Sequence, residues 1–252
     1  MKILKTLVIV VLAIIVIIIL ALGYLGFIPG LSAIFGSDKP RDLGVKYTQA
    51  DYVSAAKKNK VNIAVVDSAQ SIKSSLEWGG SNQINNSWTS QEVTATINAN
   101  SADWEYFPMK DVQFKIDPDG SVEVSGILSV DKLKGYAQAT NVSEADIQTV
   151  ENVFNEFKIP KGPIPFYIKG NLTIKDDNVD VEVPKLEIGR LPIPRNLYES
   201  AKSSFESFAK QQLTSGGYGN FYIKSLDFNN GKLNFNGNLP ASVTIAKKVI
   251  GL

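Results

Sequence analysis

The sequence contains no histidine and no cysteine, so the side chains that most often perform catalysis or hold metals are missing. Their absence excludes Ser/His/Asp triads, cysteine nucleophiles and zinc sites built from the usual ligands. The sequence also has no G-x-S-x-G elbow, phosphate-binding loop or metal-ligand spacing. We therefore expect a protein that is not an enzyme and that has no cofactor and no metal.

The carboxylates mostly occupy turns, helix starts and the polar side of alternating strands, where they face solvent. By residue type alone, Glu105, Asp176 and Asp177 are candidate ligands. Asp117 and Asp119 resemble the start of a calcium loop, but an EF-hand needs a longer series of oxygen ligands between two helices. Strand-like alternation flanks these two residues, so the sequence predicts a turn.

The longest apolar stretch is at the N-terminus, where no charged residue occurs between positions 6 and 37. Residues 7 to 28 reach the length of about 20 residues with which an apolar helix crosses a bilayer. The alternatives are a cleaved signal peptide, whose apolar core is shorter, and a buried helix of a soluble core. The sequence favours an uncleaved anchor, with these positions inside the membrane: Leu7, Val11, Ile15, Ile19 and Leu22.

Charge predicts the orientation of the chain and limits its partners. Lys2 and Lys5 precede the apolar run, which predicts a cytoplasmic N-terminus and an extracytoplasmic domain. Residues 1 to 37 would then be the tip, anchor and linker, and residues 38 to 252 the domain. The chain has 26 basic and 25 acidic side chains, and removing the two leading lysines leaves 24 against 25, a net charge of −1. Such a domain has no basic surplus with which to bind nucleic acid.

Apolar periodicity predicts the elements of the domain. Helical patterns cover residues 48–58, 89–98, 143–157 and 194–213. Alternating patterns predict a strand over 61–66, two strands around a turn at 79–82, and hairpins over 112–124 and 166–183. A further hairpin over 221–239 changes parity between Ile223 and Leu226, which predicts a bulge near Lys224.

These elements predict an α+β fold, in which an N-terminal transmembrane helix is followed by an antiparallel sheet wrapped on helices. Residues 111–128 and 225–239 echo each other, since each runs from an alternating strand through a glycine turn to a second strand. Two copies of a helix-plus-hairpin unit would explain the echo. The alternative is that unrelated hairpins look alike.

Two segments carry a resemblance to known bacterial proteins. Residues 181–194 (VEVPKLEIGRLPIP) resemble the strand, "iG-x-LP-x-P" and helix passage of anchored proteins of the YpmS type. Leu226-Asp227-Phe228 and Gly231-Lys232-Leu233 are similar to the closing strands of LmeA-like phospholipid-binding proteins. The resemblance covers residues 89–239. It implies a TULIP-like domain that holds acyl chains between a long helix and a curved sheet, and it carries over no ligand residue.

Apolar helix and strand faces can either fill a core or line a hollow, and their periodicity is the same in both cases. With the resemblance, we expect non-catalytic binding of membrane lipid or another apolar ligand by an anchored extracytoplasmic domain. The alternative is a structural or adaptor domain of the envelope with a filled core and a protein partner of unknown identity. The candidate lining residues are Leu197, Ala201, Phe205, Phe208, Leu213, Val181, Val183, Leu233 and Phe235.

Overall fold

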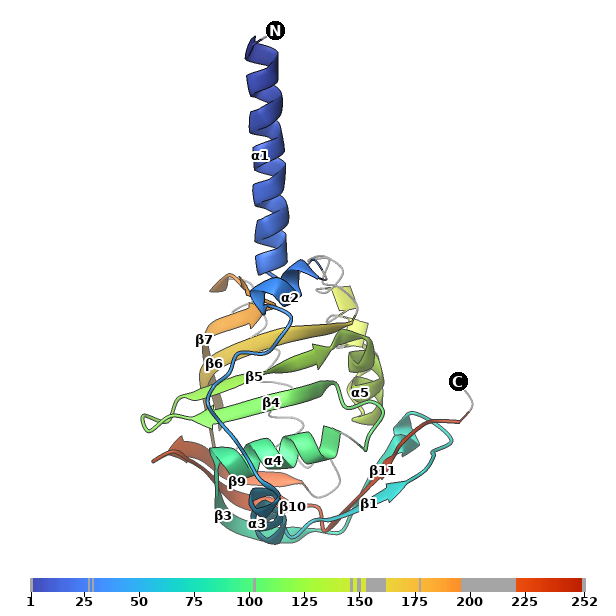
Figure 1. Ribbon diagram of the computed structural model, residues 1–252. Helices are drawn as coiled ribbons and strands as arrows, with labels where there is room; N and C mark the ends of the chain where they lie inside the picture. The colour runs from blue at the N-terminus through green and yellow to red at the C-terminus, as the bar shows by residue number, and fades with distance from the viewer. Residues whose placement is uncertain are drawn as a thin grey trace.

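The computed structural model describes residues 2–26, 28, 30–101, 103–145, 147–148, 151–152, 162–176, 178–195 and 221–250, without the side chains of residues 2–12 and 100–101. In this part of the chain an antiparallel sheet curls into a half-barrel accompanied by a few helices (Figure 1). The predicted α+β class and antiparallel sheet are therefore confirmed. The predicted helices over 143–157 and 194–213 lie largely outside the described residues.

An N-terminal helix, α1 (Lys2–Tyr24), projects from one end of the half-barrel and is followed by the short helix α2 (Leu31–Phe35) (Figure 1). Of the predicted anchor positions, Leu7 and Val11 lie outside the residues whose side chains are described. Ile15, Ile19 and Leu22 are 46%, 41% and 39% exposed. Within the described residues, no helix combines the length and the hydropathy of a membrane span.

The eight-stranded sheet is antiparallel throughout and divides around its longest strand, β6. One edge of β6 pairs with β7. Its other edge pairs first with β5 and then, at Ile174 and Lys175, with β9. Along the sheet the strands are β3 (Asn82–Thr89), β10 (Lys232–Leu239), β9 (Tyr222–Asn229), β6 (Pro163–Lys175), β5 (Val122–Ser129) and β4 (Met109–Ile116), with β7 (Asn178–Ile188) and β8 (Leu191–Pro192) beyond β6.

The three predicted hairpins are confirmed as β4–β5, β6–β7 and β9–β10. The predicted bulge is present as well, because Asn236 pairs with Ser225 and Gly237 with Ile223, which leaves Lys224 as the extra residue. Apolar side chains from distant strands meet on one face. Ile116 of β4 and Phe228 of β9 share one cluster, so this apolar face is the concave one.

Two helices begin with a reciprocal cap. In α3 (Gln49–Asn59), the Thr48 hydroxyl accepts a hydrogen bond from the Asp51 N–H, and the Asp51 carboxylate accepts one from the Thr48 N–H. Thr89 and Glu92 make the same exchange at the start of α4 (Ser90–Ser101). Further helical segments include η1 (Lys73–Ser75), η2 (Val130–Lys132) and α5 (Leu133–Ala139).

Helix α4 lies along the free edge of β4 and replaces a neighbouring strand there (Figure 1). Ser90, Thr94 and Asn98 are four residues apart, so they lie on one helical face. The Ser90 hydroxyl accepts from the Ile116 N–H, the Thr94 hydroxyl from the Phe114 N–H, and the Asn98 side chain bonds both the N–H and the C=O of Val112. These bonds satisfy edge groups that would otherwise be exposed for pairing with another chain.

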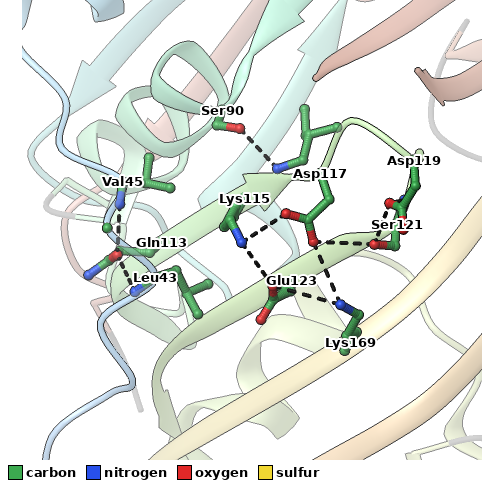
Figure 2. A network of polar contacts seen from close by, with 12 residues as sticks. Leu43, Val45, Ser90, Gln113, Lys115, Asp117, Asp119, Ser121, Glu123 and Lys169 are labelled. Atoms are coloured by element: carbon green, nitrogen blue, oxygen red, sulfur yellow. Dashed lines mark hydrogen bonds and ion pairs between the residues drawn. The ribbon is translucent and has the colours of Figure 1, made fainter. Parts of the chain in front are cut away.

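Residues 38–47, here called the strap, run from α2 across the outer face of the sheet to α3 (Figure 1). The side-chain amide oxygen of Gln113 accepts from the N–H groups of Leu43 and Val45 at 2.8 and 3.2 Å (Figure 2). Arg41 pairs with the buried Glu187 at 2.6 Å and lies 5.0 Å from the centre of the Tyr167 ring. The strap therefore covers outer-face side chains that would otherwise be open to water.

A second, three-stranded sheet has the order β1 (Asn62–Val66), β11 (Ser242–Ala246) and β2 (Leu76–Gly79). The prediction that β2 and β3 form one hairpin is wrong, because β2 pairs with β11 and β3 pairs with β10. Gly80, with a φ of +62°, carries the chain from one sheet to the other. The partner of β2 is β11, which lies far along the sequence, and β11 also pairs in parallel with β1.

Candidate binding site

The predicted lining residues fall into two groups. Val181 and Val183 lie on β7 and Leu233 and Phe235 on β10, with Val181 and Phe235 buried and the other two half-buried. None of these four lines the apolar pocket formed elsewhere in the molecule. The other five lie outside the described residues: Leu197, Ala201, Phe205, Phe208 and Leu213.

The concave face around Phe235 is a packed cluster. Phe235 meets Trp88 edge-on, with ring centres 6.2 Å apart, and both side chains are at most 6% exposed. Ile84 on the same strand as Trp88, Ile174 and Ile223 on two further strands, and Ala55 of α3 belong to the cluster, and Leu233 packs against it. Such contacts are those of a filled core. These positions therefore contribute to the stability of the half-barrel through burial.

The aromatic pocket, as we call it, is an apolar cavity of about 270 Å³ between the three-stranded sheet and the end of the half-barrel that carries α4 and α5. Residues from both sheets, three helices and several connecting segments surround it, so no single element defines it. Its lining comprises Asn59, Val61, Ile63, Leu76, Trp78, Thr96, Trp104, Phe107, Tyr136, Thr140, Phe221, Leu239, Pro240, Val243 and Ile245.

The three-stranded sheet gives the pocket one apolar wall. The register places Ile63 beside Val243 and Val243 beside Trp78, so these three side chains lie on the same face. Ile245 and Leu76 are the next pair on that face. Residues of the opposite face, such as Ser242 and Thr244, are mainly small or polar. The apolar face of a sheet must be buried against other elements of the fold. Here the elements packed against that face leave a cavity.

The half-barrel supplies the aromatic wall. Trp104 follows α4, and its ring centre lies 6.3 Å from that of Phe107 and 5.5 Å from that of Tyr136 on α5. The indole N–H of Trp104 donates to the Ser75 hydroxyl at 3.2 Å, and Ser75 in turn donates to the Ile72 carbonyl. This chain of bonds fixes Trp104 against the small sheet. The rigid ring then shapes the pocket.

The pocket has an apolar interior and a partly open rim. None of the described residues that line it is charged. The hydroxyls of Thr96 and Thr140 donate to helix carbonyls of Glu92 and Tyr136, so they are already hydrogen-bonded. Trp78 at the rim is 38% exposed. The arrangement can remove an apolar group from water but offers few polar groups with which to orient it.

A charged network lies on the outer face of β4, β5 and β6 (Figure 2). Lys115 lies between Asp117 and Glu123 at 2.8 and 3.0 Å, and Lys169 approaches the same two carboxylates. The hydrogen bond to Asp117, followed by that to Glu123, raises the pKa of Lys115. Burial, followed by its hydrogen bond to Glu123, raises the pKa of Tyr167 to about 12. Two cations balance two anions here, which is the pattern of a structural ion-pair network.

The candidate carboxylate ligands either have structural roles or lie outside the described residues. Glu105 accepts the Val249 N–H at 3.1 Å and so holds the C-terminal segment. Asp117 and Asp119 form the predicted turn, in which Gly120 N–H donates to the Asp117 carbonyl. Asp176 occupies a turn with a φ of +47°, and Asp177 lies outside the described residues. Among the described residues, no three acidic side chains gather to hold a metal ion.

Sequence reasoning missed the aromatic pocket because its walls come from segments without a clear period. Residues 99–108 had no predicted element, yet Trp104, Tyr106 and Phe107 place three aromatic rings within four positions. An aromatic run next to a predicted helix end was the available signal. Strand β11, which gives Val243 and Ile245, was not predicted at all.

No family model, no curated protein and no solved structure matches this chain.

Proposed function

We propose that the chain is a non-catalytic membrane-anchored protein whose extracytoplasmic domain binds an apolar ligand, such as the acyl chain of a lipid. The observation that carries the proposal is the aromatic pocket, an uncharged cavity at the junction of two sheets. Ligand pockets are concave and mostly apolar, and they often lie between structural units. Its volume of about 270 Å³ suits one acyl segment or one ring rather than a whole two-chain lipid.

Burial of the ligand would supply the binding energy. Removing apolar surface from water is worth about 25 cal/mol per Å². Rigid aromatic walls add dispersion contacts at a low entropic cost, because Trp104 is already fixed by its bond to Ser75. A TULIP-like arrangement, with acyl chains between helix 194–213 and the sheet and with two helix-plus-hairpin units, stays a prediction. That helix lies largely outside the described residues.

The anchored topology rests on the sequence of residues 7–28 and on the two lysines before them. In support, α1 projects away from the domain and its side chains from Ile14 to Ile19 are exposed (Figure 1). Protease added to intact spheroplasts should digest residues 38–252. A domain that is digested only after the membrane is broken would contradict the proposed orientation.

A structural or adaptor role is the second candidate, and the filled cluster of Trp88 and Phe235 favours it. The two functions make different demands on Val243, which lies on the middle strand of the small sheet and faces the pocket. If the pocket holds a ligand, a polar side chain there removes binding. If the pocket is only a packing defect, the same substitution at Val243 changes the stability of the domain alone.

The test is native mass spectrometry of the full chain released from lipid nanodiscs, comparing the parent, Val243→Gln and Val66→Gln. Val66 is the matched control, because it is exposed on the opposite face of the small sheet. We expect bound lipid in the parent and in Val66→Gln and its loss in Val243→Gln. Absence of lipid from all three proteins, or equal lipid in all three, would overturn the proposal.

A further inference from the structure

A second cleft is lined by residues of α3, of the edge strand β3 and of β10. Helix α3 and strand β3 lie at the end of the half-barrel opposite α1 (Figure 1). Its volume of about 650 Å³ is within the range of ligand pockets. In contrast to the aromatic pocket, the described residues that line it are lysines and side-chain amides, with no carboxylate among them. We call it the lysine–amide cleft, and its lining is Lys57, Lys58, Lys60, Gln83, Asn85, Asn86 and Asn236.

The three lysines differ in their partners. Lys58 is committed to the fold, since its ammonium pairs with the buried Glu92 at 2.6 Å and donates to the Ser87 carbonyl. Lys57 and Lys60 are exposed, and within the described residues neither makes an ion pair. Because Glu92 is fully engaged by Lys58, it does not offset these two charges. The cleft therefore presents two ammonium groups to an incoming ligand.

The side-chain amides also fall into two groups: those that hydrogen-bond to backbone carbonyls at the end of α3, and the others. Asn86 donates to the Lys58 carbonyl, and neighbouring Asn82 donates to the Lys60 carbonyl, so these two hold the end of α3 against β3. Gln83 and Asn85 are exposed on β3, and Asn236 lies directly opposite Asn85 on β10. Each amide offers both donors and an acceptor, which is the combination that hydroxyl groups need. Three such groups side by side form a surface suited to a polyol.

We propose that the lysine–amide cleft binds a phosphorylated sugar or polyol, with Lys57 and Lys60 on the phosphate and Gln83, Asn85 and Asn236 on the hydroxyls. Lysine binds phosphate as a mobile point charge, and its charge-assisted hydrogen bonds are stronger than neutral ones. Lysines in the last turn of a helix also interact favourably with the helix dipole, and this interaction alone would account for Lys57 at the end of α3. The dipole does not account for the adjoining amides.

The phosphate could belong to a soluble sugar phosphate or to the headgroup of a lipid. Helix α3 and strand β3, which line the cleft, lie at the opposite end of the half-barrel from α1 (Figure 1). If α1 is the anchor proposed above, the cleft faces away from that membrane, which favours a soluble ligand. The cleft itself does not depend on the anchor, so failure of the anchoring proposal would leave the ligand class unchanged.

The experiment is calorimetric titration of the full chain in phosphatidylcholine nanodiscs with glycerol 3-phosphate, glucose 6-phosphate, inorganic phosphate and glucose. A parallel arm measures cosedimentation with vesicles containing phosphatidylglycerol. The charge variant is Lys57→Gln/Lys60→Gln, and the matched control is Lys73→Gln/Lys248→Gln, two exposed lysines outside the cleft. A third protein, Asn85→Ala/Asn236→Ala, removes amides and keeps the charges.

We expect the phosphorylated polyols to bind more tightly than inorganic phosphate or glucose, and the charge variant to weaken binding at least about tenfold. The lysine control should bind like the parent, and the amide variant should lose the preference for polyol over inorganic phosphate. Binding to the vesicles alone, removed by the charge variant, would also support the class and identify a headgroup as the source. No binding in either arm, or equal weakening in variant and control, would overturn the proposal.

Discussion

Glu92, on α4, connects this helix to the end of β3 and to α3. It caps α4 by accepting the Thr89 N–H, it accepts the Ser54 hydroxyl of α3 at 2.6 Å, and it pairs with Lys58. Burial alone would raise the pKa of Glu92, but the hydrogen bonds from Lys58, Ser54 and Thr89 outweigh burial and hold it below its ordinary value of 4.5. The folded state therefore favours the ionised carboxylate.

This lowered pKa predicts a specific dependence of stability on pH. The contribution of Glu92 is complete above about pH 4.5 and is lost as the pH falls through the lower, folded-state pKa. Glu92→Gln should reduce the free energy of unfolding by about 1 to 3 kcal/mol at neutral pH. The difference from the parent should shrink on acidification, as measured by urea midpoints down to about pH 3. A difference that stays constant or grows in acid would contradict this account.

At the scale of elements, the main observation is that α4 takes the place of a strand beside β4. Both elements were predictable from the sequence, since each has a clear period. Their contact was not, because Ser90, Thr94 and Asn98 look like ordinary polar positions until the edge of β4 is known. A polar stripe four residues apart is common on solvated helices. Only the register of the neighbouring strand shows what it binds.

Asn98→Leu tests this edge. The substitution removes the partner of both the N–H and the C=O of Val112, and each backbone group left without a partner costs about 1 to 3 kcal/mol. We expect the free energy of unfolding to fall by at least about 1 kcal/mol. The control is Gln91→Leu, an exposed position of the same helix, where the change should be within about 0.5 kcal/mol. Equal effects of the two substitutions would mean that α4 does not stabilise this edge.

At the scale of the whole molecule, the two sheets together form the aromatic pocket, which neither could form alone. The hairpins of the large sheet were predictable because alternation and turn residues are local signals. The pairing of the small sheet was not, since β1 and β2 both pair with β11 near the other end of the sequence, and the turn at Gly79-Gly80 resembled a hairpin. The aromatic pocket depends on that long-range pairing. Sequence periodicity therefore predicted the scaffold, but it did not distinguish a filled core from a hollow one, and it placed the candidate ligand site on other elements.

The central claim is that the aromatic pocket takes up an apolar ligand, and the three tryptophans allow a direct test. Trp78 and Trp104 line the pocket, whereas Trp88 lies in the filled cluster and the N-terminal helix contains no tryptophan. A brominated fatty acid bound in the pocket would quench the fluorescence of Trp78 and Trp104 and leave that of Trp88 unchanged. The measurement is tryptophan fluorescence of the full chain in nanodiscs during titration with this fatty acid.

We predict saturable quenching in the parent and in Val66→Gln. Quenching should be absent from Trp78→Phe/Trp104→Phe, which keeps only Trp88, and from Val243→Gln, which keeps all three tryptophans. The result that would contradict the account is a parent protein without saturable quenching, or one whose quenching persists unchanged in Val243→Gln.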